Sequence, residues 1–221
     1  MLAHWRFAVV YMLALAIVIM VLNAHIAWMP TAILRRFPVG EAVMGTAFGA
    51  TYLVAGSIGT LGAGWIISRG NPETMLRRTI SLMRWGAIGL APFALAAPFA
   101  PGLISMIALT GIAVLFTSGI IAMGSIPFQI IAPAALRAQS IALSGLIAAL
   151  ISTGLGPLVT GLASDAAARA GAALPLSTAL AAVGAICAAM AAAMMRYALR
   201  HAVSEDQNSA PAEGACREDR S

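Results

Sequence analysis

The chain has 221 residues, of which 61% are hydrophobic and only 10% are charged, and its formal net charge is +5. Soluble domains carry about 25% charged residues, so this composition excludes a soluble globular protein and indicates a membrane protein. The basic balance does not indicate a nucleic-acid partner, because the arginines lie between apolar runs and form no basic stripe interleaved with aromatic side chains.

Six apolar runs are each long enough to cross a bilayer as a helix. In chain order they cover residues 7–34, 42–67, 75–97, 103–131, 138–163 and 174–199. The links between them are short, so successive helices run antiparallel. We therefore predict an all-α polytopic membrane protein with a six-helix transmembrane bundle over residues 1–203. The stretch 204–221 is polar and mixed in charge, which predicts a disordered cytoplasmic tail.

The arginines predict how the bundle is oriented in the membrane. Counted by parity of the links, one side receives Arg6, Arg69, Arg77, Arg78, Arg84, Arg137, Arg196 and Arg200, and the other receives Arg35, Arg36 and Arg169. Eight arginines against three place both termini in the cytoplasm, since basic residues are retained on that side. All basic residues are arginine and alanine is abundant, which is typical of a GC-rich bacterial genome. We expect a multi-pass protein of the bacterial inner membrane.

The sequence shows no set of residues for catalysis. It contains no Ser-His-Asp arrangement, no zinc-ligand cluster and no phosphate-binding loop, and no carboxylate lies near the middle of an apolar run. Its two cysteines, Cys187 in an apolar run and Cys216 in the tail, do not indicate a disulfide framework. We therefore expect no enzyme activity, no metal and no cofactor, and we expect the lipid bilayer as the main partner.

Polar residues inside the spans are costly and therefore mark candidate functional positions. The candidates for a transport pathway are Tyr11, Asn23, His25, Thr117, Ser118 and Gln129. Asn23 and His25 are two residues apart, so they point to different faces of a helix and cannot both face one cavity centre. His25 is interpreted either as a proton-responsive or substrate-contacting group, or as an interfacial histidine bonded to backbone or to a lipid headgroup. Interhelical hydrogen bonding is the alternative for Thr117 and Ser118.

Glycine and proline mark positions where helices approach closely or bend. Gly56 and Gly59 belong to lines of small residues at four-residue spacing, which let a neighbouring helix come close in lipid. Pro127 in the fourth run, and Gly156 with Pro157 in the fifth, predict kinks, because proline removes a backbone donor and clashes with the preceding turn. A kink is compatible with a moving wall and equally with static packing.

The basic loop after the second run resembles a known transporter motif. In the major facilitator superfamily (MFS) that motif is a glycine, three residues, Asp-Arg, then a glycine and paired basic residues. Here the chain reads Gly64-Trp-Ile-Ile-Ser68-Arg69-Gly70, with Arg77 and Arg78 downstream. It departs from the motif in two ways: Ser68 replaces the aspartate, and the loop to Arg77 is longer. The alternative is that this stretch serves only to pack helices together and to orient the protein in the membrane.

Two further stretches carry the same resemblance. The segment from Trp28-Met-Pro30 through Arg36 to Glu41 is similar to the first outer loop of organic-anion and Spinster-like members, and Gly154-Leu-Gly156-Pro157 is similar to their penultimate helix. Together these motifs make the apolar region resemble the C-terminal six-helix half of an MFS transporter.

The resemblance implies alternating access, in which two six-helix bundles rock about a site at the bilayer midplane. It implies that the first and fourth helices line the cavity and that the second and fifth pack against the other half. It also implies that Gly64, Ser68, Arg69, Arg77 and Arg78 hold a cytoplasmic gate. The substrate is a small solute that this chain alone does not identify.

A complete transporter of this kind needs about twelve spans, twice what this length supplies. Three hypotheses remain open. The chain is a fragment that is inactive alone; or it transports after pairing with a second six-helix half, as a separate chain or as a homodimer; or it is a non-transporting membrane scaffold or assembly protein built on transporter ancestry.

Overall fold

The computed structural model describes residues 5–71, 74–131 and 136–209, with side chains described over 7–71, 74–130 and 136–200. The elements in chain order are α1 (Trp5–Arg36), α2 (Glu41–Ser68), α3 (Met75–Ala96), the short 3-10 helix η2 (Ala97–Phe99), α4 (Leu103–Met123), α5 (Ile126–Ile131), α6 (Arg137–Arg169) and α7 (Pro175–Ser209). No strand occurs among the described residues, which confirms the all-α prediction.

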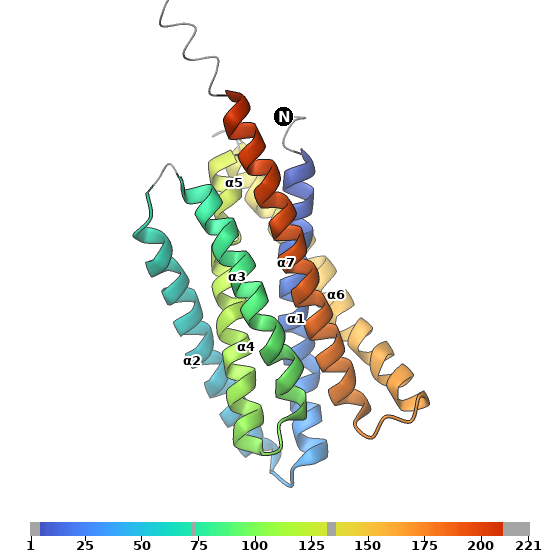
Figure 1. The fold of residues 1–221 in the computed structure, drawn as a ribbon. Coiled ribbons are helices and arrows are strands. Elements are labelled where there is room, and N and C mark those ends of the chain that lie inside the picture. Colours follow the sequence, from blue (N-terminus) through green and yellow to red (C-terminus); the bar gives the residue numbers. More distant parts are fainter. Residues whose placement is uncertain (1–4, 72–73, 132–135, 210–221) are drawn as a thin grey trace, which may run out of the picture.

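The structure also confirms six helices that are long and apolar enough to cross a membrane. The fourth of these spans, Leu103–Ile130, consists of α4 and α5 together. The helices run side by side along the bundle, and the start of α1 and the end of α7 lie at the same end of it (Figure 1). The α2–α3 link lies at that end too, while the α1–α2, α3–α4 and α6–α7 links lie at the opposite end.

One predicted helix end is wrong. The fifth span was expected to end at residue 163, but α6 continues to Arg169. The polar pair Ser164 and Asp165 is followed by three alanines, and alanine has the highest helix propensity, so the helix runs on past the apolar stretch. The sixth span, Pro175–Arg200, agrees with the predicted 174–199, and α7 continues beyond it to Ser209, into the stretch predicted as a tail. The rest of that tail lies outside the described residues.

The helices divide into a central group and two flanks. α1 packs on α6 and α7, and α3 packs on α7 and α4. α2 rests chiefly on α4, and it lies on the opposite side of the bundle from α6 (Figure 1). The core comprises three apolar clusters that follow one another along α1, the first around Tyr11 and Val18, the second around Val21 and the third around Met29 and Ile33.

The crossing of α2 and α4 is a contact between backbones. A Cβ atom at Gly59 would overlap the carbonyl oxygen of Leu115, and one at Gly119 would lie 3.2 Å from the carbonyl oxygen of Gly59. The two glycines therefore face each other at the point where the helices are closest. Close packing of this kind is the main attraction between helices in lipid, because lipid tails are as apolar as the side chains.

The break between α4 and α5 is held by α1. Pro127 lacks a backbone N–H, and the helix is interrupted at Gly124 and Ser125. The hydroxyl of Tyr11 donates to the freed carbonyl of Gly124 at 2.9 Å and lies 3.3 Å from Sδ of Met83. A Cβ atom at Gly124 would lie 2.8 Å from Cδ2 of Leu15, so a larger residue at this break would require the Leu15 side chain to move.

We predict that Gly59→Ala destabilises the bundle by about 1–3 kcal/mol, because the added methyl group forces α2 away from α4. Thermal unfolding of the purified protein in detergent measures the effect. The matched control is Gly62→Ala, also in α2, where no described atom lies within 4 Å of the added Cβ. Equal midpoints for the two variants would contradict the close crossing.

We predict that Tyr11→Phe lowers the free energy of unfolding by about 1 kcal/mol, because the buried Gly124 carbonyl loses its donor. Tyr52→Phe is the control, since the Tyr52 hydroxyl is buried without a hydrogen-bond partner among the described residues. Removing an unsatisfied hydroxyl costs nothing or stabilises. Denaturant titration of both variants tests the pair, and a Tyr52→Phe variant that is less stable than Tyr11→Phe would refute the assignment.

Candidate functional site

A polar cluster lies near the middle of two membrane spans, between α1 and α6. The side-chain amide of Asn23 donates to Oγ of Ser152 at 3.2 Å and lies 3.5 Å from Oγ1 of Thr153. Asn23 is half-buried, and Thr153 is exposed. The cluster therefore reaches from the packed interior of the bundle to its surface at the level of the bilayer centre. Asn23 was predicted as a pathway residue from its polarity, whereas Ser152 and Thr153 were not.

Small residues on α6 bring the cluster together. The buried face of α6 consists of Ser144, Ala148, Ser152, Gly156 and Thr160, one residue in every four. Since no side chain on this face is large, α6 lies close to the backbone of α1. A Cβ atom at Gly156 would lie 2.8 Å from the carbonyl oxygen of Met20. The same face carries the Ser152 hydroxyl, and the close approach puts it within reach of Asn23.

A second tie between the same helices lies one turn further along. The indole N–H of Trp28 donates to the carbonyl of Pro157 at 2.9 Å. Pro157 is inside α6 and supplies no N–H, so the helical hydrogen-bond ladder is interrupted at this point. Trp28 therefore ties α6 to α1 at the turn that contains Pro157.

Three of the predicted pathway residues are inside the bundle. Tyr11, His25 and Thr117 are 0%, 3% and 2% exposed. Nδ1 of His25 is hydrogen-bonded to the Val21 carbonyl at 2.8 Å, and its Nε2 has no partner among the described residues. Thr117 donates to the Ala113 carbonyl of its own helix at 2.7 Å. In this arrangement none of the three side chains opens onto a pathway.

The other two predicted pathway residues lie apart from the Asn23 cluster. Ser118 is half-buried and faces α2, with its Oγ 3.5 Å from the position of a Cβ atom at Gly56. Gln129 is exposed on α5, and its amide donates to Oγ of Ser125 at 3.1 Å. The six predicted residues therefore do not converge on one site.

The predicted gate residues cap the end of α2. Arg78 donates to the Ile66 carbonyl at 3.0 Å, which satisfies a backbone acceptor in the last turn of the helix. The guanidinium of Arg69 lies 3.8 Å from the ring centroid of Trp65. The Ser68 hydroxyl donates back to the Trp65 carbonyl at 3.0 Å.

The remaining two gate residues, Arg77 and Gly64, are exposed at the surface. Arg77 is exposed, and no hydrogen bond or ion pair of its side chain is found in the part of the chain that the structure describes. Gly64 is exposed as well, with open space where a Cβ atom would lie. Pro72 and Glu73, in the middle of the loop, are outside the described residues.

Comparison with known proteins identifies the architecture. No protein-family model matches the chain, and no curated protein matches it. Among solved structures it is similar to a bacterial homolog of the human lysosomal transporter Spinster in an inward-facing, unoccupied conformation, with a TM-score of 0.71 and 19% identity over 89% of this chain and 48% of the other. The occupied conformation matches with a TM-score of 0.66 and 18% identity over 91% of this chain and 49% of the other.

The chain thus spans about half the length of the solved structures that it matches. At this level of identity the likeness concerns the fold. The chain has the fold of about one half of the solved Spinster-homolog transporter.

Proposed function

We propose that the chain forms one half of an alternating-access transporter for a small solute, and that a second six-helix unit covers the exposed faces of α2 and α6. The observation that carries the proposal is the unequal burial of the six spans. In the apolar stretches of α2 and α6, 22% of the residues are buried, against 33 to 50% in the other four. These two flanking helices have the largest surfaces left for another partner.

The exposed face of α2 is suited to a helix rather than to lipid alone. It carries large apolar side chains such as Leu53, Leu61 and Trp65. It also carries Gly45 and Gly49, one helical turn apart, with no described atom within 4 Å of a Cβ at either position. Glycine lowers helix propensity and gains nothing from lipid contact, whereas it allows a neighbouring helix to approach closely.

The Asn23 cluster is where we place the solute pathway. Transporters with repeated bundles bind their solutes near the bilayer midplane, at the interface of the repeats. Asn23 and Thr153 occupy that depth, and they offer an amide and a hydroxyl at the edge of the bundle. The second unit would close over them and complete the site.

The cytoplasmic gate is the second part of the proposal. We place both termini, and with them the α2–α3 loop, on the cytoplasmic side of a bacterial inner membrane, as the arginine bias favours. Arg77 is exposed and Arg69 is held only against Trp65, so both guanidinium groups are available to a carboxylate of the second unit. Arg78 keeps the end of α2 in place beside them.

Cross-linking in membranes tests the pairing. We predict that Leu61→Cys on α2 and Leu146→Cys on α6, which are exposed at similar distances from the cytoplasmic ends of their helices, cross-link to a second six-helix unit. Cys187 and Cys216 are first replaced by alanine. Ile186→Cys on α7 is the control, because it is exposed on a helix outside the two flanks. A cross-linked homodimer identifies the second unit as another copy, and a heterodimer identifies it as a separate chain.

Cross-linking that is no stronger from α2 and α6 than from Ile186→Cys would contradict the pairing.

Uptake into proteoliposomes tests whether the chain, together with the second unit identified by cross-linking, transports a solute. With a panel of radiolabelled organic anions, amines and sugars, we predict saturable uptake of at least one solute. Asn23→Leu should slow it about tenfold, because one amide hydrogen bond to the solute is lost. Arg169→Gln is the control, since this arginine is exposed at the far end of α6. A folded assembly that moves none of these solutes would refute the transport function and leave a scaffold.

A further inference from the structure

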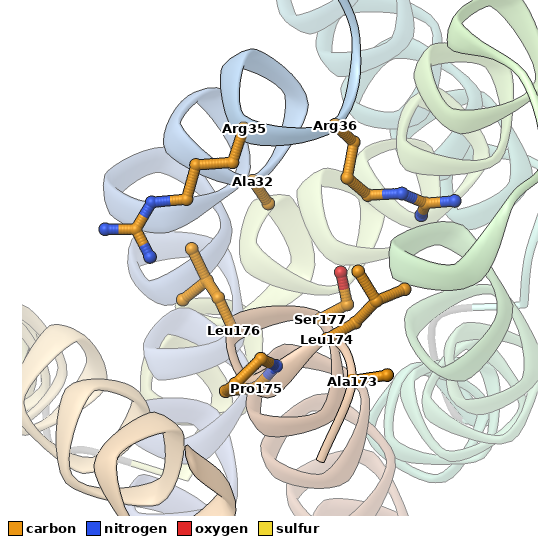
Figure 2. A pocket seen from close by; sticks show the side chains of 8 residues that line it. All are labelled: Ala32, Arg35, Arg36, Ala173, Leu174, Pro175, Leu176 and Ser177. Atoms are coloured by element: carbon orange, nitrogen blue, oxygen red, sulfur yellow. The ribbon is translucent and has the colours of Figure 1, made fainter. Parts of the chain in front are cut away.

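A small cavity lies between the end of α1 and the beginning of α7. Its volume is about 220 Å³, and its walls include Ala32, Arg35, Arg36, Pro175 and Ser177 (Figure 2). One water molecule occupies about 30 Å³, so the cavity has room for a polyatomic ion. None of the residues that line it is acidic.

The first turn of α7, which lines this cavity, has unpaired backbone donors. Pro175 begins the helix and has no N–H. The first helical hydrogen bond runs from the N–H of Thr178 to the carbonyl of Leu174, at 2.9 Å. The N–H groups of Leu176 and Ser177 therefore have no helical carbonyl to bond. Such free donors, together with the positive end of the helix dipole, attract anions.

A largely buried serine whose hydroxyl has no partner among the described residues is a second feature of this cavity. Ser177 is 3% exposed, yet its hydroxyl forms no hydrogen bond with any residue that the structure describes. Figure 2 shows Oγ of Ser177 pointing into the cavity, toward the last turn of α1 that carries Ala32 and Arg36. The Ser177 hydroxyl oxygen is not among the fully enclosed unpaired polar atoms of the described residues, so it can be reached from the cavity and is free to donate to a ligand there.

The two arginines supply positive charge at the rim. Arg36 donates to the carbonyls of Pro98 and Ala100, at 2.7 and 3.0 Å, which fixes its position but leaves its charge uncompensated. Arg35 is exposed and makes no hydrogen bond within the described residues. Both guanidinium groups are turned away from the centre of the cavity (Figure 2). The long side chain of Arg35 is free to rotate over a bound anion.

We propose that this cavity binds a phosphate group. The donors around the cavity are two backbone N–H groups, the Ser177 hydroxyl and, after rotation of its side chain, the guanidinium of Arg35, and the oxygens of one phosphate accept from all of them. The cavity lies where two membrane-spanning helices end, which is the level of phospholipid headgroups. The phosphate therefore comes either from a phospholipid or from solution, and the donor set is the same for both.

Two measurements distinguish the sources. In nanodiscs of phosphatidylethanolamine and phosphatidylglycerol, native mass spectrometry counts the phospholipids that stay bound to the released protein. In dodecyl maltoside micelles freed of lipid, ³¹P NMR follows the titration of inorganic phosphate. We expect one strongly retained phospholipid if the site takes a headgroup, or saturable phosphate broadening if it takes the free ion.

Substitutions assign the binding to this cavity. Ser177→Ala and Arg35→Gln should each weaken binding about tenfold, since each removes one hydrogen bond to a charged group. Thr178→Ala and Arg169→Gln are the matched controls. The Thr178 hydroxyl donates to the Leu174 carbonyl at 2.9 Å and Thr178 does not line the cavity, and Arg169 is an exposed arginine of α6. Because Arg35 is exposed, its variant tests the site even if Ser177→Ala is unstable.

The proposal is overturned if the wild-type protein retains no phospholipid and shows no phosphate binding at millimolar concentration. It is also overturned if the two cavity variants bind as tightly as the two controls. Both results are independent of whether the chain transports a solute.

Discussion

Contact between helix backbones is the constraint on which the rest of the bundle depends. Lipid tails solvate leucine as well as a protein core does, so burial of large apolar side chains gives little attraction between helices in a membrane. Glycine lets two helix backbones approach closely, and the dense packing between them supplies the attraction instead. Gly59 brings α2 onto α4 at the Leu115 carbonyl, and Gly156 brings α6 onto α1 at the Met20 carbonyl. Both flanking helices are thus attached along one narrow stripe, and their remaining faces stay uncovered.

The same medium requires a donor wherever the backbone leaves regular helix geometry, because no water is present to satisfy a freed carbonyl. In this bundle the donors come from α1 and reach irregular or proline-containing turns elsewhere. They are the Tyr11 hydroxyl, the Trp28 indole and the Arg36 guanidinium, and their acceptors are the carbonyls of Gly124, of Pro157, and of Pro98 with Ala100. α1 therefore donates hydrogen bonds to an irregular or proline-containing turn in each of three neighbouring parts of the bundle.

The sequence could not predict which side of each helix faces the inside of the bundle. For this reason most of the predicted pathway residues lie outside the candidate site. A membrane helix is apolar toward lipid and apolar toward the core, so its periodicity does not show which side is buried. Asn23 and His25 were equally polar candidates, yet one contacts Ser152 at the bundle edge and the other is sealed inside. Thr117 was predicted for a pathway on polarity alone, and its hydroxyl bonds its own helix.

Hydropathy by itself determined the number of spans, their approximate lengths and their alternating direction, because an unbroken apolar run in lipid has no alternative to a helix. It failed where alanine extends a helix beyond the apolar stretch, as at Arg169. Only the tertiary structure decided which distant residues meet. Asn23 joins Thr153, Tyr11 joins Gly124, and Arg35 shares a cavity with Ser177. Such pairs depend on the crossing of helices that are far apart in the chain, and local sequence carries no record of that crossing.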